Sequence, residues 1–287
     1  MTASKSILAI IVLYRLSADE SPAYTSLRAL MARNEEAAAA IDVLLFDNSP
    51  YTQEPPVNFS GRYVSDTSNP GLAAAYNHAL RIAADENIPW LLLLDQDTRL
   101  HEAYLEELLL AVRQLDAQSG VAALVPKLAD EGVLCSPIYP PSFGPARPIP
   151  ADWCGVTGEN LHAFNSGGVM NVAALQRIGG FSPEFPLDYL DHATFAALNK
   201  SGGKLQILKA VLAHELSSHH EAPRNSATAA RQQRVLEAEH RFYTQYGTTG
   251  DRLLRRFRLL RAVAGRLIRR KEGAQTWQML KSALRPR

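Results

Sequence analysis

Short apolar segments alternate with amphipathic segments along the first 126 residues of the chain. The apolar segments are rich in Ile, Leu and Val and are bounded by turn-forming residues, which is typical of buried strands. They span residues 6–14, 41–46, 61–65, 90–94 and 121–125. The amphipathic segments predict helices over residues 22–33, 72–84 and 101–118. This alternation predicts an α/β fold in which helices cover both faces of a mostly parallel sheet.

The pattern changes after Pro126, where prolines and glycines interrupt the alternation. Residues 137–150 contain six prolines and predict an irregular loop. The later elements that the pattern predicts are strands over 161–171 and 205–212 and helices over 172–178 and 189–200. From residue 226 onward the pattern predicts only helices, with a break at Gly247 and Gly250.

The composition adds limits to this picture. The chain has 287 residues, of which 46% are hydrophobic and 21% are charged, and these proportions are typical of globular proteins. No apolar run approaches the roughly 18–20 residues that a membrane-spanning helix needs. Only two cysteines, Cys135 and Cys154, favour a reducing compartment. We expect one domain over residues 1–225, with parts over 1–126 and 127–225, and a helical extension over 226–287.

The net charge of +1 conceals an uneven distribution of charge along the chain. Residues 251–287 contain 12 Lys or Arg and 2 Asp or Glu, whereas the rest of the chain contains 18 basic and 27 acidic residues. Apolar residues recur here at helical spacing with arginines around them, which predicts a basic amphipathic helix. The apolar positions are Leu253, Phe257, Leu260, Ala264 and Leu267, and the arginines are Arg252, Arg255, Arg256, Arg258, Arg261, Arg266, Arg269 and Arg270.

A basic amphipathic helix of this kind fits the surface of an anionic bilayer, with arginines near the headgroups and apolar side chains toward the acyl chains. The alternative is a helix that packs on the preceding domain and exposes a solvated basic face. Nucleic acid is not an expected partner, because no base-reading or RNA-stacking motif accompanies the charge.

Two carboxylates follow the apolar run Leu91–Leu94, with one residue between them. If the strand continued, alternation would direct Asp95 and Asp97 to the same side. Two neighbouring carboxylates repel each other unless a positive charge lies beside them. A divalent cation that also holds phosphate oxygens is a suitable partner. The alternative is a solvated strand end with turn-forming aspartates.

Other polar segments lie where predicted strands end or helices begin: Asp47-Asn48-Ser49-Pro50, Asn69-Pro70-Gly71 with the following helix to Asn77, and Asp95-Gln96-Asp97-Thr98. In open α/β sheets ligands bind beyond the carboxyl ends of the strands. In order and spacing these segments resemble the family 2 inverting glycosyltransferases, which have the GT-A fold, and more narrowly bacterial rhamnosyltransferases. The resemblance covers about residues 6–215.

The resemblance implies sites for a nucleotide sugar and a metal. The positions that correspond to nucleotide-sugar contacts are Val12, Tyr14, Asp47, Asn69, Gly71, Asn77, Asp95 and Gln96, and those for Mn²⁺ or Mg²⁺ are Asp97 and His214. Some of these residues have structural alternatives. Gly71 could supply only a positive φ, Asn69 could be only a turn or cap residue, and Tyr14 could simply pack.

The second part of the domain should bind the acceptor. The resemblance assigns acceptor contacts to Ser166, Gly167, Gly168 and Asp188, and the catalytic base to Asp191 near a helix start. The family usually has an acidic residue two places later, where this chain has Ala193. Alternatives are a strand bulge at the glycines, helix capping by either aspartate, and Asp188 as the base.

The implied function is metal-assisted transfer of a sugar with inversion, L-rhamnose from dTDP-L-rhamnose, to a hydroxyl of a cell-surface glycan or glycolipid such as lipopolysaccharide or O-antigen. The expected location is the cytoplasm, peripheral at the inner face of the bacterial cytoplasmic membrane. Alternatives are another donor, such as a UDP-hexose or UDP-galactofuranose, or a catalytically degenerate, membrane-associated binding protein. A nucleotidyltransferase and a Rossmann dehydrogenase are disfavoured, because no glycine-rich phosphate loop follows the first strand.

Overall fold

The computed structural model describes residues 5–115, 119–140, 146–213, 226–268 and 273–285. The chain divides into two compact units. Unit 1 comprises residues 1–139 and 148–215, and unit 2 comprises residues 140–147 and 216–287. Each unit is described by itself below.

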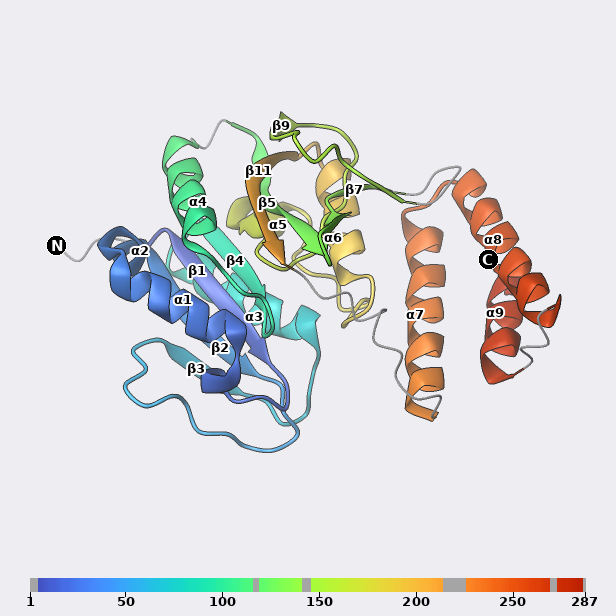
Figure 1. Cartoon of the computed structure of the whole chain (residues 1–287), viewed down its shortest axis with the longest axis horizontal. Helices are drawn as coiled ribbons and strands as arrows, with labels where there is room; N and C mark the ends of the chain where they lie inside the picture. The colour runs from blue at the N-terminus through green and yellow to red at the C-terminus, as the bar shows by residue number, and fades with distance from the viewer. Residues whose placement is uncertain (1–4, 116–118, 141–145, 214–225, 269–272, 286–287) are drawn as a thin grey trace. The chain divides into compact units, whose positions relative to one another are not determined.

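Unit 1 is built on a mixed sheet (Figure 1). Its strands are β1 (Ile7–Leu13), β2 (Ile41–Asp47), β3 (Arg62–Ser65), β4 (Trp90–Asp95), β5 (Val121–Asp130), β6 (Val133–Ser136), β9 (Gly155–Thr157), β10 (Val169–Asn171) and β11 (Lys204–Ala213). The order across the sheet is β3-β2-β1-β4-β10-β5-β11-β9, and β6 pairs with β5. Strands β3, β2, β1 and β4 are parallel neighbours, as are β5 and β11, whereas β10, β9 and β6 run antiparallel to their neighbours. Two short strands, β7 (Ile138–Tyr139) and β8 (Arg147–Pro148), complete the set of described strands.

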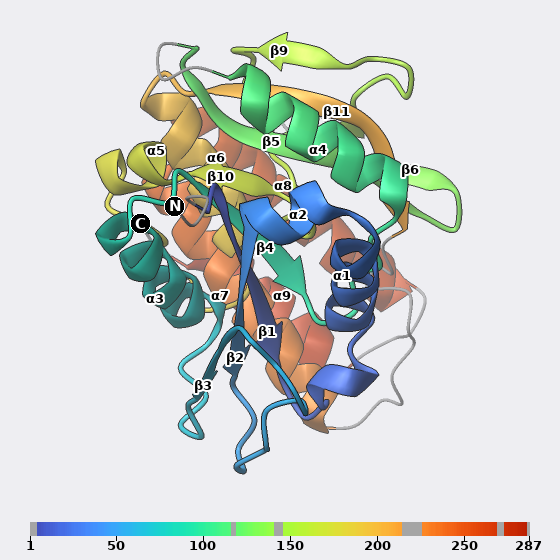
Figure 2. The same cartoon turned by 90° about the vertical axis from the view of Figure 1, so that its left-hand side faces the viewer.

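Helices cover both faces of this sheet (Figure 2). They are the 3₁₀ turn η1 (Ala18–Glu20) and helices α1 (Pro22–Arg33), α2 (Glu35–Ala40), α3 (Leu72–Asp85), α4 (Glu102–Gln114), α5 (Val172–Arg177) and α6 (Leu190–Lys200). Helices α1, α2 and α4 lie on one face, and α3, α5 and α6 lie on the other. Because both faces are covered, every residue of β1 is buried.

Local sequence explains where the first helix begins. The Ser21 side chain accepts a hydrogen bond from the backbone N–H of Tyr24, and Pro22 occupies the first helical position, where a missing N–H costs nothing. Helix α1 then buries Ala23, Tyr24 and Leu27 in the core that it shares with β1 and α4. The predicted start of this helix is therefore confirmed.

The predicted strand over 161–171 is wrong for most of its length. Only Val169–Asn171 forms a strand, β10, which lies between β4 and β5 and runs antiparallel to both. A tight turn precedes it, because the N–H of Gly168 donates to the carbonyl of Asn165 (2.8 Å) and Gly167 has a φ of 73°. Apolar periodicity did not reveal this turn, nor did it predict α2, β6 and β9.

Unit 2 contains helices α7 (Ser226–Gln245), α8 (Thr249–Ile268) and α9 (Ala274–Leu284). Leu236, Leu259 and Ala283, one from each helix, form a small apolar cluster. None of the described helices of the chain is both long enough and apolar enough to cross a membrane.

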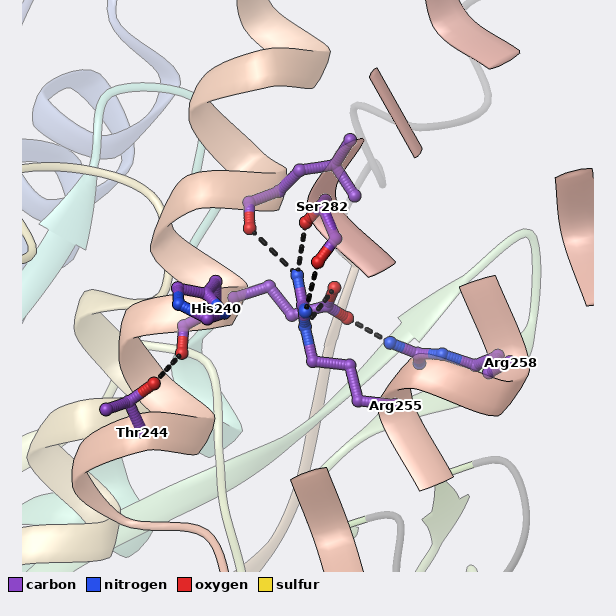
Figure 3. Close-up of polar contacts among 7 residues, drawn as sticks. His240, Thr244, Arg255, Arg258 and Ser282 are labelled. Atoms are coloured by element: carbon purple, nitrogen blue, oxygen red, sulfur yellow. Dashed lines mark hydrogen bonds and ion pairs between the residues drawn. The ribbon is translucent and has the colours of Figure 1, made fainter. Parts of the chain in front are cut away.

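A buried ion pair ties these helices together (Figure 3). The side chains of Arg255 on α8 and Glu239 on α7 are 3% and 7% exposed, and their N–O distance is 3.0 Å. The Arg255 guanidinium also donates to the carbonyl of Leu236 (3.1 Å) and to the hydroxyl of Ser282 on α9 (2.7 Å). The expectation that Arg255 belongs to a surface ring of arginines is therefore wrong.

The second arginine on Glu239 is Arg258, whose side chain is 52% exposed. The same carboxylate is thus bonded by one buried arginine and by one exposed arginine. Removing one partner of a buried pair strands the other charge in a poorly solvated site, whereas an exposed ion pair contributes little.

We therefore expect Arg255→Met to destabilise unit 2 by about 3 kcal/mol and the matched Arg258→Met to cost less than about 1 kcal/mol. Hydrogen exchange of the backbone amides of α7–α9 in the full chain measures both costs. Equal losses of protection in the two variants would contradict the central role of Arg255.

Candidate functional site

Strands β1, β2 and β4 end at the same edge of the sheet. Leu13 of β1 is in register with Asp47 of β2, and Val12 of β1 is in register with Asp95 of β4. The predicted nucleotide-sugar residues at the ends of these strands are therefore brought together by parallel pairing.

Asp95 is the last residue of β4 and is partly buried. Its Oδ2 accepts a hydrogen bond from the hydroxyl of Ser166, which lies in the turn before β10. Its Oδ1 accepts a longer bond from the hydroxyl of Tyr76 on α3 (3.4 Å). Asp95 therefore joins the end of β4 to helix α3 and to the turn before β10.

Tyr76 is completely buried, and the charges around its phenol affect its pKa. Burial raises the pKa of Tyr76 well above its ordinary value of 10, and the charge and hydrogen bond of Asp95 raise it further. The negative charges of Asp191 and Asp97 also raise this pKa, although by less. Of these three aspartates, only Asp95 bonds to the Tyr76 hydroxyl, and the other two act on its pKa through their charge. Tyr76 shares its helix face with the buried Ala73, Ala79 and Leu80, so helical spacing indicates only a packing role for it.

Asp97 lies in the turn that follows β4, and its side chain is exposed. The N–H of Thr98 donates to the carbonyl of Asp95 (3.0 Å) and closes this turn. The strand therefore ends at Asp95, so the argument that alternation directs both carboxylates to one side does not apply.

Gln96 connects the ends of β4 and β1. Its side-chain oxygen accepts a bond from the backbone N–H of Tyr14 (2.8 Å), and its carbonyl accepts one from the Ser21 hydroxyl (2.7 Å). The Tyr14 side chain is 40% exposed, and the Arg15 guanidinium lies 5.1 Å from the centre of its ring. Val12 is buried in the strand itself. The Tyr14 ring is thus available at the surface of this edge.

Asp47 is fully buried and its carboxylate is already hydrogen-bonded. It accepts bonds from the backbone N–H of Ser49 (2.9 Å), the amide of Gln53 (3.1 Å) and the hydroxyl of Tyr63 (2.8 Å). Burial, and then the bond to Asp47, raise the pKa of Tyr63 well above its ordinary value. In this structure Asp47 holds the loop after β2, and its contact with a nucleotide stays a prediction.

The turn at Asn69 and Gly71 meets the segment that precedes α6. Asn69 is exposed with a φ of 52°, and Gly71 has a φ of 90°. A Cβ on Gly71 would lie 2.6 Å from the carbonyl oxygen of Pro186, which accepts a bond from the N–H of Ala73 (3.3 Å). Glycine is required at Gly71 both by its backbone angle and by this close approach.

Asn77 is held by the backbone of Phe181. Its amide donates to the Phe181 carbonyl (2.7 Å) and its oxygen accepts from the Phe181 N–H (2.9 Å). Both polar groups of this side chain are therefore committed to a contact between α3 and the loop before α6. A role in nucleotide binding stays a prediction for Asn77.

The two glycines predicted to contact the acceptor are buried. A Cβ on Gly167 would lie 2.7 Å from Leu212 Cδ1, and the Gly167 carbonyl accepts a bond from the Tyr104 hydroxyl (2.6 Å). The N–H of Gly168 is used in the turn described above. Close packing is thus a sufficient reason for glycine at residue 167, and sugar contact stays a prediction.

Asp191 is the second residue of α6, and Asp188 lies just before the helix; both are partly buried. Tyr189, the N-cap, has a φ of 66°, which places the chain in a sharp turn between them. One carboxylate oxygen of Asp191 accepts a bond from the N–H of His192 (2.7 Å).

Sequence analysis missed a pair of histidines beside Asp191. The Nδ1 atoms of His162 and His192 lie 3.0 Å apart, and the rings of Tyr189 and His192 have centres 5.1 Å apart. His162 is 3% exposed. Burial, and then the charge of His192, lower the pKa of His162 to about 3. The two histidines are 30 residues apart, so only their chemical type could have drawn attention to them.

The metal prediction rests on Asp97 and His214, and His214 lies outside the described residues. Within the described part of the chain, no group of three or more His, Cys, Asp or Glu residues is arranged to hold a metal ion. The carboxylate oxygens of Asp95 and Asp97 are nevertheless the donor type that Mg²⁺ and Mn²⁺ prefer.

Comparison with known family models gives a match over part of the chain. The family model described as Glycosyl transferase family 2 matches residues 20–133, which include Asp47, Asp95 and Asp97. No curated protein sequence matches the chain.

Several solved structures have a similar fold. Staphylococcus aureus TarS is 15% identical, with a TM-score of 0.52 over 83% of this chain and 43% of TarS. S. aureus TarS 1–349 in complex with UDP-GlcNAc is 13% identical, with a TM-score of 0.54 over 83% of this chain and 65% of that chain. GalNAc-T7 with UDP, GalNAc and Mn²⁺ is 13% identical, with a TM-score of 0.51 over 83% of this chain and 50% of that chain. These likenesses confirm the predicted GT-A-like fold, and the chain spans less than half the length of the full TarS chain.

The low pKa of His162 predicts how the stability of the protein changes with pH. Because the folded-state pKa is below the ordinary value of about 6.5, the unfolded chain binds a proton that the folded chain excludes as the pH falls. This stabilising contribution is present above about pH 6.5 and is lost as the pH falls toward 3. Between pH 7 and pH 5 we expect a loss of about 2 kcal/mol that His162→Gln does not show.

Urea denaturation of wild type and His162→Gln at both pH values measures this difference. Equal losses of the free energy of unfolding in the two proteins would mean that His162 is protonated in the folded state.

Proposed function

We propose that the chain, whose residues 20–133 match the model described as Glycosyl transferase family 2, transfers a sugar from a nucleotide-sugar donor to an acceptor hydroxyl with inversion at the anomeric carbon. The observation that best supports this reaction is the position of Asp95 at the carboxyl end of β4, where its carboxylate accepts bonds from Ser166 in the turn before β10 and from Tyr76 on α3. These bonds join the proposed donor side to the proposed acceptor side.

The donor nucleotide is proposed to lie along the ends of β1, β2 and β4. The exposed ring of Tyr14 offers a face on which a base can stack, next to Val12 and Gln96. Asp95 is proposed to bind the ribose, and Asp47, Asn69, Gly71 and Asn77 to shape or line the nucleotide site. Support comes from TarS 1–349, whose structure contains UDP-GlcNAc, and GalNAc-T7, whose structure contains UDP and GalNAc, because both share the fold.

Asp97 is proposed to hold Mn²⁺ or Mg²⁺ together with His214. A divalent cation at this position would offset the negative charge that develops on the departing nucleoside diphosphate. The exposed position of the Asp97 carboxylate leaves it open to such a ligand set, which the diphosphate oxygens would complete. The solved GalNAc-T7 structure contains Mn²⁺, which supports the choice of metal.

Asp191 is proposed as the general base. Its carboxylate takes the proton of the acceptor hydroxyl while that oxygen attacks the anomeric carbon. As the new bond forms, the bond from the anomeric carbon to the diphosphate oxygen breaks on the opposite side and the nucleoside diphosphate leaves, so the configuration inverts. The contact with the His192 N–H fixes one carboxylate oxygen and leaves the other for the acceptor.

The acceptor is proposed to lie between the turn before β10 and the start of α6, with contacts from Ser166, Gly167, Gly168 and Asp188. Ser166 acts here mainly by holding Asp95, to which its hydroxyl is bonded. Gly167 and Gly168 are buried, so they would shape the site through their backbone.

The proposed donor is dTDP-L-rhamnose and the proposed acceptor is a hydroxyl of a cell-surface glycan or glycolipid, as in lipopolysaccharide or O-antigen assembly. This choice rests on the sequence resemblance to bacterial rhamnosyltransferases. UDP-hexoses and UDP-galactofuranose are the alternative donors. An acceptor on a lipid carrier would be reached at the inner face of the bacterial cytoplasmic membrane.

Release of nucleoside diphosphate from a panel of nucleotide sugars, with and without Mn²⁺, tests this proposal. We expect release from one donor, dependent on Mn²⁺, and loss of metal-dependent release in Asp97→Asn. With an acceptor present, Asp191→Asn should slow transfer by about 10²–10⁴-fold, the usual contribution of a general base.

Asp152→Asn is the matched control, because Asp152 is exposed in the segment before β9 and the change removes the same charge. It should retain the wild-type rate. Equal rates in Asp191→Asn and Asp152→Asn would refute the role of Asp191. Binding of no donor by calorimetry would refute the transferase assignment itself.

A further inference from the structure

Helix α8 has apolar side chains on two different faces. One face is buried within unit 2, where Leu259 and Val263 are each 5% exposed. The other consists of Leu253, Phe257, Leu260, Ala264 and Leu267, which we call the exposed stripe. Phe257 is 65% exposed. Steps of four and three residues keep these five side chains on one face of the helix, and at about 100° per residue the middle of that face lies about 100° around the helix from Leu259 and Val263.

The exposed stripe is not needed for the packing of the three helices. The apolar cluster of unit 2 uses Leu259, together with Leu236 and Ala283 from the other helices. An exposed row of large apolar side chains on a soluble surface normally marks a place where another surface binds.

Arginines border the exposed stripe. By helical spacing Arg256 lies along one edge and Arg261 along the other, and Arg261 is exposed. Arg255 and Arg258 do not contribute in the same way, because both bond to Glu239. Along the whole segment 251–287 basic residues outnumber acidic ones by 12 to 2. An apolar centre with basic edges is the pattern of a helix that lies in the plane of an anionic bilayer.

We propose that the exposed stripe of α8 binds the headgroup region of a bilayer that contains anionic lipid. The apolar side chains would enter the boundary of the acyl chains, and Arg256 and Arg261 would contact the phosphate groups. The stripe extends over the 15 residues from Leu253 to Leu267, or about 21 Å, so several lipids fit along it. Ile268, which is 82% exposed, extends the apolar surface at the end of the helix.

Charge argues against the other occupants of this surface. Two copies that paired through the stripe would bring their rows of arginine together without acidic partners beside the stripe. A nucleic acid would place phosphates over the apolar centre, where no side chain can neutralise them. A lipid surface satisfies both the apolar centre and the basic edges. This inference does not depend on sugar transfer.

Cosedimentation of the full chain with vesicles tests the proposal. The vesicles are phosphatidylcholine alone, or phosphatidylcholine with about 30% phosphatidylglycerol. We expect binding to the second kind only, and weaker binding in 0.5 M NaCl because salt screens the arginines. The double variant Phe257→Asp with Leu260→Asp should bind at least tenfold more weakly, as should Arg256→Glu with Arg261→Glu.

The matched control is Val57→Asp with Val133→Asp, because these two valines are 84% and 70% exposed and lie in unit 1. This variant should bind vesicles as the wild type does. Absence of binding by the wild type, or equal binding by all variants, would overturn the proposal. So would a wild-type dimer, measured by light scattering, that the Phe257→Asp variant disperses. A fall in thermal stability in that variant with unchanged vesicle binding would show that the stripe packs inside the protein.

Discussion

The carboxylate of Asp95 is the group on which the site depends. It closes β4 at the carboxyl edge of the sheet, and it is hydrogen-bonded by Ser166 and Tyr76. Ser166 lies in the turn before β10, which pairs with β4, so the bond extends the contact between these strands into that turn. Tyr76 is buried in α3, whose start is held by Pro186 from the segment before α6. One acidic side chain therefore fixes three segments that are distant in the sequence, and a substrate would meet a site that is already ordered.

Much of this architecture follows from local pattern. The strands that carry Asp47 and Asp95 are continuous apolar runs. Parallel pairing with β1 aligns their ends, and this alignment does not depend on the conformation of the intervening loops. Helix α1 begins where Ser21 and Pro22 predict. Such features depend on neighbouring residues or on a simple period, so a single sequence suffices to predict them.

The features that could not be predicted are contacts between residues far apart in the chain. Strand β10 inserts antiparallel between β4 and β5 although only three residues form it, and the histidines His162 and His192 meet across 30 residues. Asn77 resembles a ligand-binding residue in its motif, yet both polar groups of its side chain bond to Phe181. The type of a residue in a motif shows which hydrogen bonds its side chain can form. The fold then determines with which partners it forms them. The sequence thus predicts that Asp47 and Asp95 lie at the same edge of the sheet, whereas the bonds that their neighbours make could not be predicted.

Helix α8 shows how the same limit applies to charge. The sequence places arginines all around an apolar row, and helical spacing alone does not show which of them is buried. Glu239 distinguishes Arg255 from the other arginines. Its buried carboxylate requires a cation nearby, and Arg255 is the side chain that α8 directs toward it. With Arg255, Leu259 and Val263 directed inward, the apolar row lies on a different face of α8, and its side chains remain exposed. The buried ion pair therefore determines which surface of α8 remains open for a partner.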